Sequence, residues 1–387
     1  MRPSLPRLPD ELILEILRDQ ALSQGDLAAL SLLSRRFLDQ VRRFLYETVN
    51  IVVVDEHVEY GIDGLDGETS MQLVYSKRTW RLLRTMQDSP KLAALVDHLR
   101  FRSDISWISE HEIGGVATSP RVAYSTFLRL ARKATKISAH DARRLQETIL
   151  QSANCKHITY LDIDHPTDVS LARLSDLLPN LNHLKLGTLP TALPDAPLFR
   201  RLSSLSICSS TATLLEAPFL LSTRFTLRRL RVNLNILIAL SRTHSLSDFA
   251  LLDYLHVYTA TMPVTSANSD TEYTQIVSFW SLICRSTSLR TLSFDGRTFN
   301  SYEYGLFYCQ LLQIGVRDLD TLKTIRFEND IPVDRLAAIL GWSEFPALRY
   351  IVLPVNTFKE EVDTRRRKVA AVTAMCEGTG IEVMLSD

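Results

Sequence analysis

Apolar residues recur along this chain in a fixed pattern, apolar-x-x-apolar-x-apolar, where x is any residue. The copies begin near residue 96 and continue almost to the end of the chain. Alternation at the end of each copy favours a short strand with one buried face, because successive side chains on a strand point to opposite faces. The pattern residues are Val96-Leu99-Phe101, Ile158-Leu161-Ile163, Leu181-Leu184-Leu186, Leu202-Leu205-Ile207, Leu227-Leu230-Val232, Leu252-Leu255-Val257, Leu289-Leu292-Phe294, Leu322-Ile325-Phe327 and Leu348-Ile351-Leu353.

The spacing of the copies is more informative than any single match. If one residue in three is apolar, chance alone produces the pattern in about one window in 27. From Ile158 onward the copies start at positions 158, 181, 202, 227, 252, 289, 322 and 348. Most intervals between these starts are within or near the repeat length of about 20–29 residues that is typical of leucine-rich repeats. The polar stretch 260–275 accounts for most of the longest interval, between Leu252 and Leu289, and we expect it to be a mobile excursion.

A helical apolar stripe and a short breaker precede many copies, as in "LSDLLPNLNHLKL" (174–186). The prediction is therefore an α/β solenoid, with parallel strands on its concave side and helices on its convex side. The Asn that closes each tight turn in regular repeats is missing almost everywhere, so we expect irregular coils. The first full coil is predicted at 89–101, and further strands at 136–141 and 381–385. A doubly wound α/β domain also alternates helices and strands, but repeat spacing without a glycine-rich phosphate loop favours the solenoid.

The segment 1–48 has a different, purely helical pattern. Pro9 with Asp10 and Glu11 is typical of a helix start, since proline tolerates the first turn and acidic side chains suit its positive dipole. Three helices of about 10 residues each bury too little surface to be stable alone, so their outward leucines need a partner. We predict domains at 1–48 and 49–387. The three apolar stripes are Leu12, Ile13, Ile16 and Leu17; Leu27, Leu30 and Leu33; and Phe37, Val41, Phe44 and Leu45.

The segments "LPDELILEIL", "DLAALSLLSRRF" and "LYETV" together resemble the F-box, the adaptor-binding module of cullin-RING ubiquitin ligases. The resemblance covers the segment 1–48, and Phe37 occupies the position of the family's typical Trp. The repeats that follow resemble the leucine-rich-repeat regions of fungal-type F-box proteins. What the resemblance implies is an adaptor-facing set of Leu8, Pro9, Ile13, Ile16, Leu30 and Phe37.

The resemblance also implies a function without catalysis. The chain would be the substrate-recognition subunit of an SCF-type E3 ubiquitin ligase, joined to a Skp-family adaptor and a cullin scaffold and holding an unknown protein substrate. Two alternatives are a helical N-terminal cap that binds no adaptor and a repeat scaffold without a ubiquitin role. An enzyme is not expected, because the chain has no G-x-S-x-G, Walker, G-x-G-x-x-G or H-E-x-x-H motif, and we predict no metal site or cofactor.

Composition narrows the partners and the compartment. With 44 basic and 44 acidic side chains, the chain carries no net charge that would draw it to nucleic acid or a membrane surface. Its five cysteines form no C-x-x-C pair, which favours reduced thiols. No apolar run is long enough to span a bilayer, and acidic residues interrupt the N-terminal apolar stretch. We expect a cytoplasmic or nuclear location.

Polar residues at the alternating strand positions predict where a substrate binds. Two arginines on the strand near 229 lie beside two tyrosines and a histidine on the strand near 254. Such residues dominate binding hot spots, and the arginines could pair an acidic or phosphorylated segment. Alternatively, the side chains simply stack on one another as cation-π pairs. We expect charge reversal of both arginines to abolish substrate capture at unchanged stability. The predicted patch is Arg229, Arg231, Tyr254, His256 and Tyr258.

Overall fold

The computed structural model describes residues 35–57, 71–103, 113–117, 120–140, 155–164, 171–187, 199–208, 226–234, 249–259, 288–296, 320–328, 347–354 and 362–386, with single positions at 26, 29, 150, 237 and 336. The chain divides into two compact units. Unit 1 is Met1–Val169 with Asp176–Asn180, and unit 2 is Ser170–Ser175 with Leu181–Asp387. The boundary falls within the helix α8 (Leu171–Leu177).

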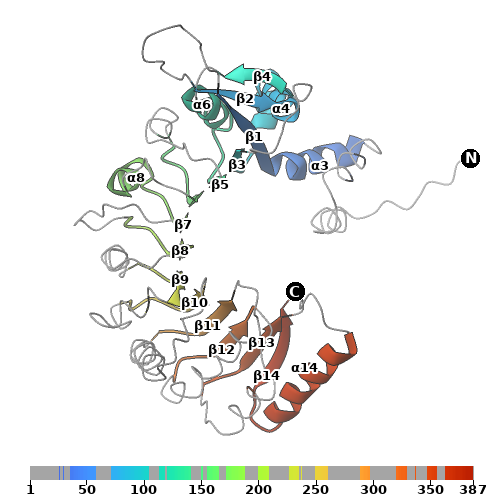
Figure 1. Ribbon diagram of the computed structural model, residues 1–387, viewed down its shortest axis with the longest axis vertical. Coiled ribbons are helices and arrows are strands. Elements are labelled where there is room, and N and C mark those ends of the chain that lie inside the picture. Colours follow the sequence, from blue (N-terminus) through green and yellow to red (C-terminus); the bar gives the residue numbers. More distant parts are fainter. Residues whose placement is uncertain are drawn as a thin grey trace, which may run out of the picture. The chain divides into compact units, whose positions relative to one another are not determined.

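Unit 2 is a run of parallel strands in which neighbours along the chain are neighbours in the sheet (Figure 1). Its last strand, β14, confirms the strand predicted at 381–385, and helix α14 (Val362–Cys376) packs beside it. The strands are β7 (His183–Leu186), β8 (Ser204–Ile207), β9 (Arg229–Asn233), β10 (Tyr254–Thr259), β11 (Thr291–Gly296), β12 (Thr324–Phe327), β13 (Tyr350–Pro354) and β14 (Glu382–Ser386).

One backbone hydrogen-bond pattern repeats from coil to coil. The carbonyl of Asp253, just before β10, accepts hydrogen bonds from the consecutive amides of Arg290 and Thr291, both 2.9 Å long. A chain can repeat such a bond only if each coil follows the previous one in the same register, so the strands are successive copies of one unit. The same pair of bonds is accepted by Asn182, Ser203, Arg228, Arg290 and Lys323 in unit 2, and by Asp97 and Thr135 in unit 1.

The apolar pattern residues form the core of both units. In all nine copies the three pattern side chains are at most 5% exposed. Phe294 and Phe327, equivalent residues of β11 and β12, stack with ring centroids 5.8 Å apart. Burial of these residues is the main force holding the coils together, because each coil covers the apolar face of the next.

Unit 1 departs from the predicted all-parallel arrangement. Its strand order is β6-β5-β3-β1-β2-β4, in which β1, β3, β5 and β6 are parallel, whereas β2 runs antiparallel to both β1 and β4. Strand β5 confirms the strand predicted at 136–141. The elements are α3 (Arg35–Glu47), β1 (Thr48–His57), β2 (Met71–Ser76), α4 (Lys77–Asp88), α5 (Pro90–Ala93), β3 (His98–Ser103), β4 (Ile113–Ala117), α6 (Pro120–Leu130), β5 (Lys136–His140) and β6 (Tyr160–Ile163).

Strand β4 has no apolar pattern because close packing requires glycine there. A Cβ atom on Gly114 would lie 2.6 Å from the Trp80 Cβ, and one on Gly115 would lie 2.7 Å from Cε3 of the same indole. Both distances are too short for any side chain. Glycine is depleted in strands and adds nothing to an alternating apolar pattern. A strand whose glycines allow a tryptophan to pack against its backbone therefore cannot be predicted from apolar periodicity.

Thr48 is the first residue of β1, and unit 1 extends across this position from Met1 to Val169. The division into domains at 1–48 and 49–387 therefore stays a prediction. Helix α3 contains the third apolar stripe, of which Val41 is fully buried and Phe44 and Leu45 are half-buried. Glu47 ends the helix, and its carbonyl accepts a hydrogen bond from the Asp97 amide next to β3. Apart from single positions at 26 and 29, the first two predicted helices lie outside the described residues, as does the predicted excursion at 260–275.

Candidate functional site

The predicted adaptor-facing residues fall almost entirely outside the described part of the chain. Leu8, Pro9, Ile13, Ile16 and Leu30 are not described, and of Phe37 only the position on α3 is described. Their role therefore stays a prediction from the F-box resemblance. The predicted substrate patch, in contrast, lies on described strands of unit 2.

The sheet register brings the five predicted patch residues onto two adjacent strands. Arg229 is paired with Tyr254 and Arg231 with His256, while Tyr258 is one pleat further along β10. Their neighbours Leu230, Val232 and Leu255 are fully buried in the core. The patch side chains therefore share the opposite face of the sheet, which we call the polar face of unit 2.

The patch residues differ in exposure. Arg229 is exposed and Tyr254 is half-buried. In contrast, His256 and Tyr258 are only 5% and 2% exposed. The Tyr258 hydroxyl donates a hydrogen bond to the carbonyl of Ile207, at the end of β8. A partner can thus reach Arg229 and Tyr254 directly, whereas Tyr258 belongs to the interior of the unit.

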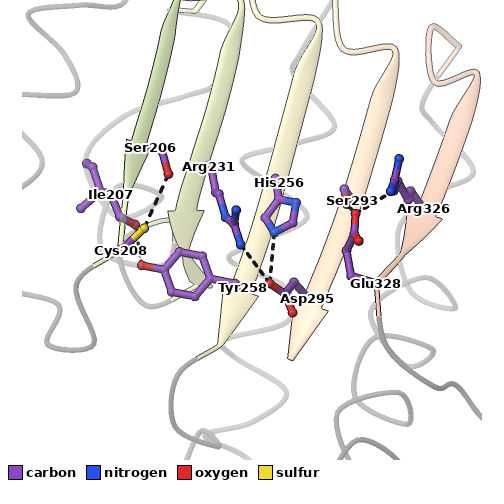
Figure 2. A network of polar contacts seen from close by, with 10 residues as sticks. All are labelled: Ser206, Ile207, Cys208, Arg231, His256, Tyr258, Ser293, Asp295, Arg326 and Glu328. Atoms are coloured by element: carbon purple, nitrogen blue, oxygen red, sulfur yellow. Dashed lines mark hydrogen bonds and ion pairs between the residues drawn. The ribbon is translucent and has the colours of Figure 1, made fainter. Parts of the chain in front are cut away.

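Asp295 organises the inner part of this face, as Figure 2 shows. Its Oδ2 lies 3.0 Å from Arg231 Nη2 and 3.6 Å from His256 Nε2. The Arg231 guanidinium also lies over the ring of Tyr258, 6.0 Å from its centroid. This last contact is the cation-π pairing that the sequence left open as an alternative. The inner half of the patch is consequently occupied by interactions within the chain.

The polar network continues onto the next strands (Figure 2). Ser293 Oγ donates to Glu328 Oε1 over 3.5 Å, and the same oxygen lies 2.6 Å from Arg326 Nε. Arg231 Nε is buried and has no hydrogen-bond partner among the described residues. Arg231 is therefore held by one good ion-pair contact, and its charge is balanced by Asp295.

Asp295 was missed by sequence reasoning, although a signal for it exists. It directly follows Phe294, the last pattern residue of its copy, and so occupies the same alternating face as Arg231 and Tyr258. The alternation rule that selected the five patch residues also selects Asp295 when it is applied to the next strand. The distance between Arg231 and Asp295, two strands apart, comes only from the side-chain packing.

The equivalent face of unit 1 holds a second polar cluster. His98 Nε2 lies 2.8 Å from Ser138 Oγ, and burial, followed by the charges of Arg100 and Lys136, lowers the pKa of His98 to about 4. Burial acts to raise the pKa of Asp97, but hydrogen bonds from Lys136 and Thr135 outweigh it, so this pKa is lowered. Asp97 thus stays ionised beside a neutral histidine.

We expect His98 to make unit 1 less stable in mild acid. A histidine in the unfolded chain has a pKa near 6.5, whereas the pKa of His98 in the folded chain is about 4. The contribution of neutral His98 to the free energy of unfolding is fully present above pH 6.5. It is lost as the pH falls from 6.5 to 4, because the unfolded state binds more protons than the folded state in this range. The measurement is the denaturation midpoint of wild type and His98→Gln across this range.

The His98→Gln variant should show the flatter profile, since an amide can keep a hydrogen bond to Ser138 without titrating. Asp97 does not interfere with this measurement, because its contribution to the free energy of unfolding is lost only as the pH falls through its lowered pKa, below 3.8. Equal pH dependence of the two proteins between 6.5 and 4 would contradict the buried, neutral state of His98.

The described residues offer little for covalent or metal chemistry. Cys155, Cys208 and Cys376 are free thiols, and burial raises the pKa of Cys155 to about 12, which disfavours the reactive thiolate. Within the described ranges no group of three or more His, Cys, Asp or Glu side chains is placed to hold a metal ion. None of the described helices is both long enough and apolar enough to cross a membrane.

Comparisons with known proteins show a weak likeness to a solved structure. No protein-family model matches the chain, and no curated protein matches it. Among solved structures, the chain is similar to a chain of the "Crystal structure of Rad7 and Elc1 complex in yeast". The two share 14% sequence identity with a TM-score of 0.33, and the match covers 94% of this chain and 78% of that one. A likeness at this level is too low to assign a family or a function.

Proposed function

We propose that the chain is a substrate-recognition subunit of an SCF-type ubiquitin ligase in the cytoplasm or nucleus. Its segment 1–48 would dock on a Skp-family adaptor held by a cullin scaffold, and its repeats would capture a protein substrate. The observation that supports this function is the direct junction of two parts. The F-box-like segment ends where α3 gives way to β1, with Glu47 the last helical residue and Thr48 the first of the strand.

The proposed role needs no active site in this chain. A substrate held close to a charged ubiquitin-conjugating enzyme experiences a raised effective concentration, which alone accelerates transfer. The chain must therefore supply two binding surfaces, one for the adaptor and one for the substrate. A repeat solenoid is suited to this, because it offers a long accessible face whose side chains come from successive strands.

The adaptor role is tested by co-purifying a Skp-family adaptor with the tagged full-length chain. We expect wild type to retain the adaptor and an Ile16→Ala, Leu30→Ala double variant to lose it, since each buried anchor contributes about 2 kcal/mol or more. Arg229→Glu is the matched control, because it changes an exposed residue of unit 2 and should keep the adaptor.

The outcomes separate the two functions. If wild type fails to retain the adaptor under conditions where the folded chain is intact, the chain is a repeat scaffold without this ubiquitin role. If the double variant binds as well as wild type, the assignment of Ile16 and Leu30 to the adaptor contact is wrong. Substrate capture is compared by mass spectrometry between wild type and an Arg229→Glu, Tyr254→Ala variant, which alters the accessible half of the patch.

A further inference from the structure

The outermost strand of unit 2, β14, leaves apolar side chains exposed on both of its faces. Met384 is 44% exposed and Leu385 is 46% exposed. The register places Leu385 beside Leu353 of β13, a pattern residue that is only 5% exposed. Inside the run, such a position is covered by the coil that follows. Leu385 therefore lies at a core position that none of the described strands covers.

The hydrogen bonds from β14 to β13 determine which backbone groups of β14 point outward. The Glu382 amide donates to the carbonyl just before β13 over 2.7 Å. Alternate residues of a parallel strand bond to the same neighbour, so Met384 and Ser386 also face β13. The amides and carbonyls of Val383 and Leu385 consequently point to the other edge. None of the described strands pairs with β14 there (Figure 1).

The backbone of β14 can pair with a second β14 in the antiparallel direction. Residues directly opposite each other in an antiparallel pair must either both exchange hydrogen bonds or both lack them. If Met384 lies opposite Met384 of the second copy, Val383 lies opposite Leu385. Val383 and Leu385 are the residues with outward-pointing backbone groups, so this register satisfies the rule along the whole strand.

The side chains of β14 are complementary to themselves in the same register. Val383 and Leu385 continue the core side of β13, where their register partners are pattern residues, and they would form two apolar cross-strand pairs. On the other face Met384 would contact its own copy. Glu382 would lie opposite Ser386, so no like charges would face each other.

Strand β14 also lacks the features by which outer strands avoid pairing, which include proline, lysine and bulges. Its only charged residue is Glu382 at the first position, and its five register pairs with β13 are uninterrupted. The outer strand of unit 1, β4, differs in both respects. Its register with β2 shifts between Tyr75 and Ser76, and two of its five residues are glycines, which weaken a strand.

We propose that β14 is an interaction surface for a second copy of this chain, whose β14 pairs with it antiparallel about a two-fold axis at Met384. Such a contact uses the same residues on both copies and closes as a dimer. It extends the sheet of unit 2 and covers Leu385 of each copy with Val383 of the other. The contact is independent of the proposed ubiquitin role.

The test measures the mass of the full-length chain by analytical ultracentrifugation over a range of concentrations. Wild type should form dimers reversibly. Met384→Lys should raise the dissociation constant about tenfold or more, because it places two like charges directly opposite each other, and Met384→Glu should do the same. An equal mixture of these two variants should recover the dimer, since opposite charges then meet at the axis. The matched control is Leu251→Lys, which changes a leucine that is also 46% exposed but lies in a turn.

The other outcomes are equally decisive. Wild type that stays monomeric at every concentration, or a Met384→Lys chain that dimerises as wild type does, overturns the proposal. If both charged variants lose the dimer and their mixture does not recover it, the copies do not meet at Met384, and the proposed pairing is wrong.

A second variant, Leu385→Pro, tests the backbone part of the contact. It removes an outward-pointing amide, and proline is tolerated on an outer strand where the amide faces solvent. We expect this variant to lose the dimer while its denaturation midpoint stays close to that of the monomeric Met384→Lys chain. A Leu385→Pro chain that dimerises as tightly as wild type would contradict the pairing of β14 with itself.

Discussion

Replacing Phe294 with alanine is expected to destabilise unit 2 by about 3–5 kcal/mol, the usual range for a buried phenylalanine. Phe294 is 1% exposed and stacks on Phe327 of the neighbouring coil. The substitution removes contacts on both sides of a strand in the middle of the run, so the loss should spread to the adjacent coils. Hydrogen exchange of the β11 and β12 amides during denaturant titration measures the effect.

The matched control is Phe294→Leu, which keeps most of the side-chain volume. We expect it to cost less than about 1.5 kcal/mol, because cores tolerate substitutions that preserve volume better than truncations. A double-mutant cycle with Phe327→Ala should show a coupling of about 0.5–1.5 kcal/mol from the stacked rings. An alanine variant as stable as wild type would contradict the burial of Phe294 between coils.

Arg231→Glu is expected to destabilise unit 2 by about 3 kcal/mol, the low end for breaking a buried ion pair. The Arg231 side chain is 30% exposed and that of Asp295 is 11% exposed. The new glutamate would face Asp295 in a poorly solvated place, so repulsion and desolvation add to the lost contact. Thermal and chemical denaturation of the full chain provide the measurement.

Arg229→Glu is the internal comparison, since Arg229 is exposed on the same strand and surface substitutions usually change stability by no more than about 0.5 kcal/mol. The exchange Arg231→Glu, Asp295→Arg should recover part of the loss by restoring opposite charges. An Arg231→Glu protein as stable as Arg229→Glu would mean that the pair with Asp295 contributes nothing.

The ion pair between Arg231 and Asp295 changes how the substrate-capture prediction must be tested. From the sequence, reversing Arg229 and Arg231 together is expected to abolish capture at unchanged stability. Because Arg231 is bound by Asp295, its reversal also damages the fold, and a loss of capture would have two causes. The accessible residues Arg229 and Tyr254 are the informative positions, and any role of the whole patch in substrate binding stays a proposal.

The buried side of the strands could be predicted well from the sequence. Each copy of the apolar pattern was located correctly, since burial of alternating side chains depends on spacing along one strand and not on any distant residue. The order of the parallel strands of unit 2 could also be predicted, because each coil of a repeat solenoid lies beside the next coil in the sequence. Where an element lacks that pattern, as at Gly114 and Gly115 in β4, the prediction failed.

The alternating apolar residues were enough to specify a run of parallel strands and to separate a core face from a polar face. Only the tertiary structure decided how the polar face is used. The pairing of Arg231 with Asp295 joins β9 and β11, which lie on either side of β10 in the sheet. The antiparallel β2 and β4 likewise depend on the close approach of Trp80 to two glycines. The periodic spacing of apolar residues within one strand determines which side chains are buried. The Arg231–Asp295 ion pair and the contact of Trp80 with β4 instead join residues that are distant in the chain.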